Sequence, residues 1–427
     1  MTAGGSAPRA TVVVTGSELV RGGRSDANGP FLAAELTRLG LEPATVTIVG
    51  DEPGELDRAI REGMQADLCV LSGGLGPTHD DRTIELVARA AGRRLIVDES
   101  LVAEIERVSR GVAERLGRPY ADFTQGVTKQ ASLPEGALAL GLAGTAPAVL
   151  LEHDGRVAVA LPGPPSELRR LWPRVLEQEA LRDLLARTRV PDHRVLRFFG
   201  PSESAVARTL EEAGGEADGL GITVCARDLE IHVDLFVAAE AEERAAALER
   251  ALRARFSQQL FAEDERPVEE IVLDLCRGAG LTLATAESCT GGLVGARLTS
   301  VPGSSDVYLG GVVSYSDDVK RDVLGVPADL LGLHGAVSAE TARAMATGAR
   351  RALGGEIGLA VTGIAGPGGG TPEKPVGLVF VHVETPERDS ASELRLPGDR
   401  EDVRGRATVT ALHLLRRTLG TNGHTPA

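Results

Sequence analysis

The 427-residue chain contains few aromatic residues and few cysteines, and both shortages restrict its function. Aromatic residues make up 3%, so the cores must be built from Leu, Val and Ala, and stacking platforms for nucleic-acid bases are scarce. The four cysteines are far apart and form no CxxC pair, which argues against a zinc knuckle or a disulfide framework. A reducing compartment suits such cysteines, and we expect a cytoplasmic protein.

Long hydrophobic runs and excess positive charge are also lacking. No stretch approaches the roughly 18 uninterrupted apolar residues of a membrane span, and the first residues lack the apolar core of a signal peptide. The formal net charge is −15, which repels a phosphate backbone unless positive charge is concentrated locally. We therefore expect no membrane partner, and nucleic acid is an unfavourable main ligand.

Lysine is nearly absent from the chain. Of the 46 basic residues only Lys129, Lys320 and Lys374 are lysines, and the others are arginines. Arginine stays protonated, whereas a lysine can lose its proton and act as a base when its pKa is lowered. Each lysine is therefore a candidate for chemistry, with chance retention as the alternative.

What is present is a repeated alternation of buried strands and amphipathic helices. Strand-like runs at 12–14, 45–49 and 68–72 alternate with helical patterns at 28–39 and 55–64. This order predicts right-handed crossovers and a parallel sheet with helices on both faces. Ligands of such sheets bind outside the carboxyl ends of the strands, so the loops after these strands are the candidate sites.

The pattern predicts three domains. Two doubly wound three-layer α/β domains occupy residues 1–178 and 266–420, and a small α+β module that resembles a KH fold occupies 190–262. The GxxG phosphate clamp of RNA-binding KH domains is missing from the module, and its surroundings are acidic. We therefore expect the module to be a rigid spacer or a dimerisation element, and the protein to be a homodimer.

The first candidate site is the loop at residues 72–83, between a strand and a helix. Its glycines let backbone amides approach an anion, which predicts a phosphate site formed with the helix N-terminus: Gly73, Gly74 and Gly76. Asp80 and Asp81 can cap that helix. Together with Asp51, which ends another strand, they can instead hold a divalent cation that bridges phosphate oxygens. The spacing alone leaves both interpretations open.

These segments resemble the molybdopterin-binding-type domain at the front of CinA-like proteins, the competence/damage-inducible A family. The resemblance is carried by GSELVRGGRSDAN (16–28), VGDEP (49–53), SGGLGPTHDDRT (72–83), GTAP (144–147) and PGPPSE (162–167). It implies metal-dependent hydrolysis of the diphosphate of ADP-ribose, and it points to Asp51 and Asp81 as functional residues. With Asp80 they form the predicted ligand set for a divalent ion of the cobalt or magnesium class. The predicted substrate-binding residues are the three loop glycines with Glu18, Asn28 and Thr78.

The second candidate site is assembled from three dense stretches at 286–292, 301–320 and 361–375, each of which adjoins a predicted strand. If these strands are neighbours, their ends form a pocket of hydroxyls, an amine and bare backbone amides. Hydroxyl, thiol and glycine residues at the start of a helix can supply an oxyanion hole or a phosphate seat, or they can simply cap the helix: Ser288, Cys289, Thr290, Gly291 and Gly292.

A hydroxyl or thiol nucleophile needs a group that takes its proton. The histidines of this region are not expected to act as bases. The pattern predicts His334 at the end of a helix, His382 in the middle of a strand and His413 in the middle of a helix. Lys320 is the substitute, acting directly or through the hydroxyl of Tyr315. The alternative is a solvated lysine paired with an adjacent carboxylate.

The region from about 268 to 419 closely resembles the carboxy-terminal CinA-like domain, which is similar to nicotinamide-nucleotide amidohydrolases. The motifs are AESCTGG, VPGSSD, GGVVSYSDDVK, GAVS, TGIAGPGGGTPEKPVG and PGDREDVRGRA. The resemblance implies conversion of nicotinamide mononucleotide to nicotinate mononucleotide and ammonia, without a cofactor.

The same resemblance implies a role for each matched residue. Ser305 is the implied nucleophile, with Cys289 as a second candidate, and Tyr315 and Lys320 handle its proton. The remaining residues bind the substrate: Ser288 and Thr362 at the carboxamide, and Arg400, Gly366 and Gly368 at the phosphate. The glycine-rich loop can alternatively be a tight connection between strands. Asp317 stands where the family often has Asn, and its carboxylate would raise the pKa of the lysine.

The sequence thus predicts a bifunctional hydrolase of pyridine nucleotides, with nicotinamide mononucleotide and ADP-ribose as substrates. The alternative from another class is a non-catalytic nucleotide- or molybdopterin-binding scaffold connected with competence or DNA damage. A third interpretation is a transferase that builds a pterin–metal cofactor.

Overall fold

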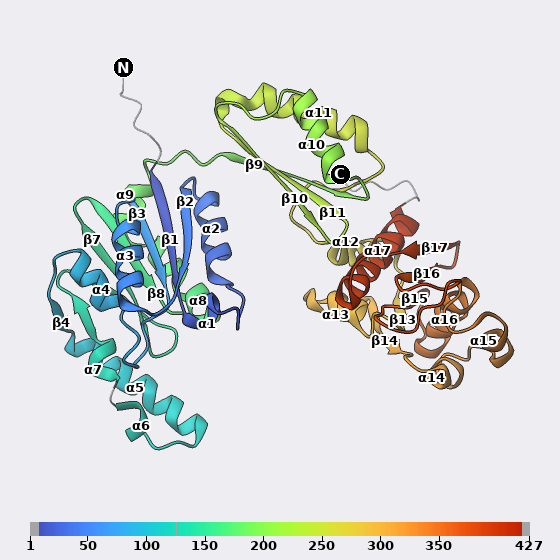
Figure 1. Ribbon diagram of the computed structural model, residues 1–427, viewed down its shortest axis with the longest axis horizontal. Helices are drawn as coiled ribbons and strands as arrows, with labels where there is room; N and C mark the ends of the chain where they lie inside the picture. The colour runs from blue at the N-terminus through green and yellow to red at the C-terminus, as the bar shows by residue number, and fades with distance from the viewer. Residues whose placement is uncertain (1–7, 125, 421–427) are drawn as a thin grey trace. The chain divides into compact units, whose positions relative to one another are not determined.

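A computed structural model describes residues 8–124 and 126–420 and divides the chain into two compact units, Met1–Pro191 and Asp192–Ala427. Figure 1 shows that each unit combines sheets with helices. None of the helices in the described ranges is long and apolar enough to cross a membrane.

The first unit is a three-layer α/β fold around one six-stranded sheet. The strand order is β2-β1-β3-β8-β7-β6. Strands β2, β1, β3 and β8 pair in parallel, whereas β7 pairs antiparallel with both of its neighbours, β8 and β6. The strands are β1 (Arg9–Thr15), β2 (Glu42–Val49), β3 (Leu68–Ser72), β6 (Leu138–Leu142), β7 (Pro147–His153) and β8 (Arg156–Leu161). The parallel pairing expected for the strands of the first segment is confirmed, and β7 and β8 form a hairpin in which His153 pairs with Arg156.

Alternate residues of the central strands face opposite helical layers, as strand geometry requires. Val12 and Val14 pack with α2 (Asn28–Arg38), α8 (Pro165–Leu176) and α9 (Glu179–Leu185). Val13 packs with α3 (Pro53–Gly63), α4 (Thr83–Ala90) and α5 (Glu99–Leu116) on the other face. The smaller elements of the unit are α1 (Ser17–Val20), α6 (Ala121–Thr124), α7 (Val127–Gln130) and the paired strands β4 (Leu95–Val97) and β5 (Ser132–Pro134).

The second unit begins with a small α+β part. Its sheet has the order β10-β11-β9-β12, and all its pairs are antiparallel. The strands are β9 (Asp192–Phe199), β10 (Leu220–Arg227), β11 (Glu230–Val237) and β12 (Leu260–Ala262). Helices α10 (Glu203–Glu212) and α11 (Glu242–Phe256) share one apolar core with β9 and β11. A short 3₁₀ turn at Ala239–Ala241 leads into α11.

The rest of the second unit is a three-layer domain with a mixed sheet of order β14-β13-β15-β16-β17. Strands β14 (Tyr308–Val313), β13 (Leu283–Glu287) and β15 (Ile357–Gly363) pair in parallel. Strand β16 (Leu378–Glu384) pairs antiparallel with both β15 and β17 (Asp389–Arg395). One face packs on α16 (Ala339–Leu353), and the other on α12 (Val268–Ala279), α13 (Leu293–Ser300) and α17 (Arg400–Gly420). Two short helices, α14 (Asp317–Asp322) and α15 (Ala328–His334), connect β14 to α16.

Candidate functional site

The ends of three parallel strands bring serine, threonine and lysine side chains together in the second unit. Ser288 follows β13, Ser314 follows β14, and Thr362 lies near the end of β15. The backbone amide of Ser288 donates to the carbonyl of Val361 at 2.9 Å, and that of Ser314 donates to the carbonyl of Glu287 at 2.8 Å. These bonds fix the strand ends side by side, so the side chains that follow them share one pocket edge.

Lys320 lies on α14 and is 1% exposed. Its Nζ donates to the carbonyl of Ser314 at 2.9 Å and lies 3.3 Å from Oγ of Ser288. Burial lowers the pKa of Lys320, and this effect exceeds the opposite effect of Asp317, whose carboxylate lies 3.8 Å away. The alternative of a solvated lysine is therefore wrong in its solvation, whereas the pairing with Asp317 that it included is present. The pair Ser288–Lys320 has the distance and the electrostatics of a hydroxyl beside its base.

The structure places Ser305 elsewhere. This residue is exposed in a short 3₁₀ turn, Ser304–Asp306, that precedes β14, whereas Lys320 follows the same strand. A strand rises about 3.3 Å per residue, so the six residues of β14 separate the two side chains by on the order of 20 Å. The prediction that Ser305 gives its proton to Lys320 of the same chain is therefore wrong, because the two motifs lie at opposite ends of one strand.

Among the described residues, Tyr315 hydrogen-bonds neither Lys320 nor Ser288. Its hydroxyl is bound by a guanidinium nitrogen of Arg400 at 2.7 Å, and the side chain is 62% exposed. A second nitrogen of Arg400 donates to the carbonyl of Gly366 at 2.7 Å. Arg400 thus connects the loop after β14 to the glycine-rich loop after β15, which also contains Gly368.

Thr362 is fully buried, and its hydroxyl donates to the carbonyl of Ala336 at 2.7 Å. The proton of this hydroxyl is therefore already committed to a protein acceptor. Thr362 lies beside Ser288 and shapes the pocket, but in this arrangement its hydroxyl proton does not point at a substrate oxygen.

The start of α13 is already occupied by a carboxylate of the protein. Glu287 is 2% exposed and accepts from the backbone amides of Gly292 at 2.9 Å, Val294 at 3.1 Å and Gly295 at 2.8 Å. The amide of Gly291 donates to the carbonyl of Ser288 at 3.1 Å. The prediction that Gly291 and Gly292 offer their amides to a substrate anion is therefore wrong. Sequence reasoning missed Glu287, and nothing in its motif marks it as a cap.

Two backbone amides follow Ser288 directly in the chain, those of Cys289 and Thr290. In residues 8–124 and 126–420 no oxygen accepts from them, and both hydrogen-bond to the sulfur of Cys289. The guanidinium of Arg404 donates hydrogen bonds to the carbonyls of these two residues, at 3.2 and 2.9 Å. Burial raises the pKa of the Cys289 thiol to about 12, so this thiol stays protonated and the alternative of a cysteine nucleophile is disfavoured.

In the first unit, the predicted anion site also lies at the carboxyl edge of the sheet. Asp51 accepts from the hydroxyl of Thr15 at 3.0 Å and from the amide of Ser17 at 2.9 Å, which joins the loops after β1 and β2. Asn28 is 5% exposed and donates to the hydroxyl of Ser72 at 2.9 Å and to the carbonyl of Gly163 at 2.7 Å. These bonds use both amide hydrogens of Asn28, which therefore ties loops together.

The loop after β3 contains three glycines, of which Gly73 and Gly74 have a backbone conformation that other residues rarely adopt. Gly73 and Gly74 have φ of +100° and +66°, and a Cβ at Gly76 would lie 2.4 Å from a carboxylate oxygen of Asp81. The hydroxyl of Thr78 is 2.5 Å from both Asp80 and Asp81, and its backbone amide donates to Asp81 at 3.0 Å.

The predicted metal-ligand set is not assembled in this arrangement. In the described ranges, no group of three or more His, Cys, Asp or Glu side chains is placed to hold a metal ion. Asp51 binds Thr15 and Ser17, whereas Asp80 and Asp81 turn toward Thr78. The hydrogen bond from Thr78 lowers the pKa of Asp80, which keeps this carboxylate ionised. Glu18 is exposed on α1.

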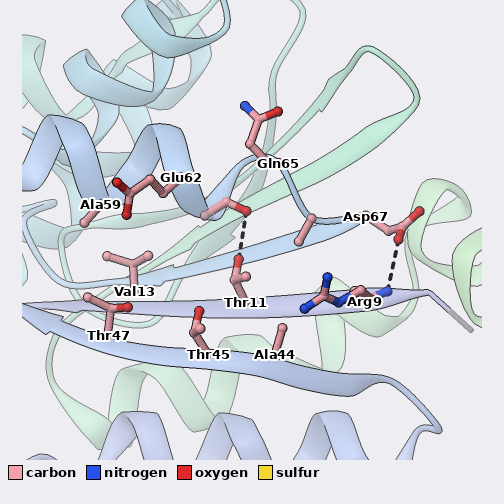
Figure 2. Close-up of a pocket in the computed structure, with 12 residues that line it drawn as sticks. Arg9, Thr11, Val13, Ala44, Thr45, Thr47, Ala59, Glu62, Gln65 and Asp67 are labelled. Atoms are coloured by element: carbon pink, nitrogen blue, oxygen red, sulfur yellow. Dashed lines mark hydrogen bonds between the residues drawn. The ribbon is translucent and has the colours of Figure 1, made fainter.

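A cavity of about 330 Å³ in the first unit lies away from these loops. Figure 2 shows Arg9, Thr11 and Asp67 along one side of it, near the amino ends of β1 and β3. The hydroxyl of Thr11 donates to the carbonyl of Gly63 at 2.8 Å, and the amide of Arg9 donates to Asp67 at 3.0 Å. None of the residues that the sequence predicts for a site lines this cavity.

Three family profiles match consecutive parts of the chain. Residues 11–182 match a probable molybdopterin binding domain, 193–262 the damage-inducible protein CinA KH domain, and 265–419 the CinA C-terminal domain. A CinA-like protein of Mycolicibacterium paratuberculosis is 43% identical over 429 residues, covering 96% of this chain and 98% of that protein. A CinA-like protein of Mycobacterium tuberculosis is 42% identical over 425 residues, covering 96% and 97%.

The chain belongs to the CinA-like family. Membership confirms the family resemblance and the fold class, including a KH-like module between two α/β domains. Among solved structures, competence/damage inducible protein CihA of Agrobacterium tumefaciens is 41% identical, with a TM-score of 0.35, and covers 37% of this chain and 99% of that chain. A family with a molybdopterin-binding domain suggests a function related to nucleotide-like small molecules.

Proposed function

We propose that the C-terminal domain of this CinA-like chain hydrolyses the amide of nicotinamide mononucleotide. The observation that carries the proposal is the buried amine of Lys320, 3.3 Å from the hydroxyl of Ser288. A neutral amine there can take the hydroxyl proton, and such pairs commonly tighten when a substrate is bound. The substrate itself is proposed from the resemblance of the surrounding motifs to nicotinamide-nucleotide amidohydrolases.

The chemistry needs only groups of the chain and one water molecule. Nζ of Lys320 takes the proton while Oγ of Ser288 forms a bond to the carboxamide carbon. The negative charge that develops on the amide oxygen is stabilised by the backbone amides of Cys289 and Thr290, which exchange a weak acceptor, the Cys289 sulfur, for this oxygen. The lysine ammonium then gives the proton to the leaving nitrogen, the C–N bond breaks, and ammonia departs from an ester on Ser288.

Hydrolysis of the ester completes the cycle. Lys320 removes a proton from water, the resulting hydroxide attacks the ester carbon, and the proton returns to Oγ of Ser288 as nicotinate mononucleotide leaves. Arg400 is the proposed partner of the substrate phosphate. Its side chain is already positioned by Tyr315 and Gly366, so little conformational entropy is lost on binding.

For the first unit we propose metal-dependent hydrolysis of ADP-ribose at the carboxyl edge of its sheet. The proposal is supported by the glycine loop, by Asp51 and Asp81 at that edge, and by the match to a molybdopterin-binding domain. The three aspartates do not form one ligand set in the arrangement that the described residues show. An ion of the cobalt or magnesium class remains the proposed cofactor.

One experiment separates the two activities in the full chain. We expect ammonia release from nicotinamide mononucleotide to persist after treatment with a chelator, and hydrolysis of ADP-ribose to AMP and ribose 5-phosphate to stop. Asp81→Ala should abolish the second activity and leave the first unchanged, with Asp154→Ala in the exposed hairpin as the matched control. Loss of ammonia release on chelation would contradict the Ser288–Lys320 mechanism. Absence of both activities would favour the scaffold, and molybdopterin binding without ADP-ribose hydrolysis would favour the transferase.

A further inference from the structure

The KH-like part of the second unit is joined to the C-terminal domain by a buried histidine and glutamate. His413 of α17 is fully buried, and its Nε2 lies 2.7 Å from a carboxylate oxygen of Glu230 on β11. The other oxygen of Glu230 lies 3.0 Å from Nε2 of His232. The ring of His413 stacks on Phe199, with centroids 3.9 Å apart and planes at 12°. Phe261 covers its edge with centroids 4.6 Å apart.

The charges in this contact stabilise the docked arrangement at neutral pH. Burial opposes ionisation of Glu230, but hydrogen bonds from His232 and His413 outweigh it and lower the pKa of Glu230 to about 2. Burial lowers the pKa of His413 to about 4, so its ring is neutral and donates one N–H to the carboxylate. Undocking would expose the stacked rings and break a charge-assisted hydrogen bond, which is costly.

The contact fixes the hairpin that immediately precedes Glu230. Strands β10 and β11 pair Arg227 with Glu230, so the turn consists of Asp228 and Leu229 alone. Both have positive φ, 49° and 70°, the conformation of a tight two-residue hairpin turn. A leucine in this region is strained, and such strain persists only where the surroundings determine the conformation.

The tip of this hairpin lines a groove of the C-terminal domain. The groove has a volume of about 1130 Å³ and is bordered by Asp228 together with Ala365, Pro367, Arg400 and Arg404. A Cβ added to Gly405 on α17 would lie 4.0 Å from a carboxylate oxygen of Asp228. Arg400 contacts Tyr315 and Gly366, and Arg404 contacts the backbone beside Ser288, so the groove adjoins the Ser288–Lys320 pair.

The carboxylates of the groove differ in what they bind. Asp399 and Asp402 accept from backbone amides at the start of α17. Asp228 and the exposed Glu401 accept no hydrogen bond from the residues that the structure describes, and the cation nearest to Asp228, Arg227, lies 3.9 Å away. Of these two carboxylates, only Asp228 belongs to the KH-like part of the unit. A carboxylate with free oxygens suits a ligand with paired hydroxyl donors, and ribose is the part of a nucleotide that carries them.

We infer that the KH-like module is a wall of the amidohydrolase site and that Asp228 binds the ribose hydroxyls of the substrate. The inference rests on the proposed function, because it assumes a nucleotide whose amide reaches Ser288. The remote part of that substrate extends along the groove, with its phosphate at Arg400 and its ribose at the hairpin. The module is then a specificity element for ribose-bearing amides rather than a spacer.

Docking is tested by cross-linking, which does not depend on activity. In a Cys225→Ser background, which removes the exposed cysteine of β10, cysteines are introduced by Asp228→Cys and Gly405→Cys. We expect a short bismaleimide to join them within one chain, detected as a linked tryptic peptide pair. The control pair, Asp218→Cys with Gly405→Cys, places the first cysteine at the other end of β10 and should not react. Equal yields from both pairs would overturn the docking.

Ribose recognition is tested by comparing Asp228→Asn with the control Asp218→Asn in the full chain. We expect Asp228→Asn to weaken binding of nicotinamide mononucleotide about tenfold or more, measured by calorimetry, and to raise KM with little change in kcat. The 2′,3′-dideoxy analogue should bind wild type and Asp228→Asn equally. Unchanged binding of the ribose ligand in Asp228→Asn would overturn the role of Asp228. If wild type binds neither ligand, the proposed function fails and ribose recognition with it, while the cross-link still decides the docking.

Discussion

Replacing Lys320 with alanine is expected to lower ammonia release from nicotinamide mononucleotide by about 10³-fold or more, because a positioned base contributes roughly 10²–10⁴-fold and here also protonates the leaving group. Lys320→Arg should be as inactive, because a guanidinium stays protonated. The measurement is kcat/KM by a coupled ammonia assay. The matched control is Arg321→Ala, which changes the adjacent, half-exposed cation of the same helix and should leave the rate near that of wild type.

The same base sets the pH dependence. The pKa of Lys320 is lowered by burial, so kcat/KM should rise with pH as the amine loses its proton and level off below the pH at which an ordinary lysine deprotonates. Asp317 opposes this shift, so Asp317→Asn should move the rise to lower pH. Substantial turnover by Lys320→Ala, or a profile that Asp317→Asn moves to higher pH, would contradict the assignment.

The second large effect concerns the two serines that compete for the role of nucleophile. Ser288→Ala should reduce turnover by about 10⁴-fold or more, because it removes the attacking oxygen. Ser305→Ala should retain the wild-type rate within about twofold, since Ser305 is exposed at the other end of β14. Both variants should unfold at temperatures close to wild type, because each removes a single hydroxyl oxygen. A large loss in Ser305→Ala with full activity in Ser288→Ala would reverse the assignment.

Most of the fold could be predicted because hydrophobic periodicity is strong in this chain. Strand β3 was predicted with its observed bounds, and the strand-like runs at 12–14 and 45–49 lie within β1 and β2. Strand β17 was missed, because its residues alternate between exposed and half-exposed positions and give no apolar signal. Its pairing with β16, and that of β16 with β15, makes part of the second sheet antiparallel, since no helix connects these strands.

Only the lysine of the candidate site could be predicted with its observed position, because lysine is rare in this chain. The scarcity of lysine marked Lys320, which the structure buries beside Ser288. Scarcity is a weaker sign of chemistry for Lys374. Its amine donates to the carbonyls of His334 and Val337, at 2.6 and 2.7 Å, and connects these two backbone positions. Ser288 meets the lysine because β13 and β14 are parallel neighbours, and this pairing is not visible in the order of the motifs along the chain.

The hydrogen-bond partners of the buried glutamates could not be predicted from the sequence either. Glu287 precedes Ser288 and gave no sign that it would bind three backbone amides of α13. His413 and Glu230 are 183 residues apart, and only the docked module brings them together. The clustering of Asp51, Asp80 and Asp81 was expected from loops that meet at one sheet edge, yet hydrogen bonds to Thr78 turn two of these carboxylates aside.

Trapping the ester on the enzyme tests the Ser288–Lys320 mechanism most directly. Full-length protein is mixed with nicotinamide mononucleotide, quenched with acid within the first turnover, digested, and examined by mass spectrometry. The mechanism predicts a nicotinate mononucleotide ester on the peptide that contains Ser288, and no such peptide from Ser288→Ala. An adduct on Ser305 or Cys289, or a burst of ammonia from enzyme that carries no adduct, would contradict the account.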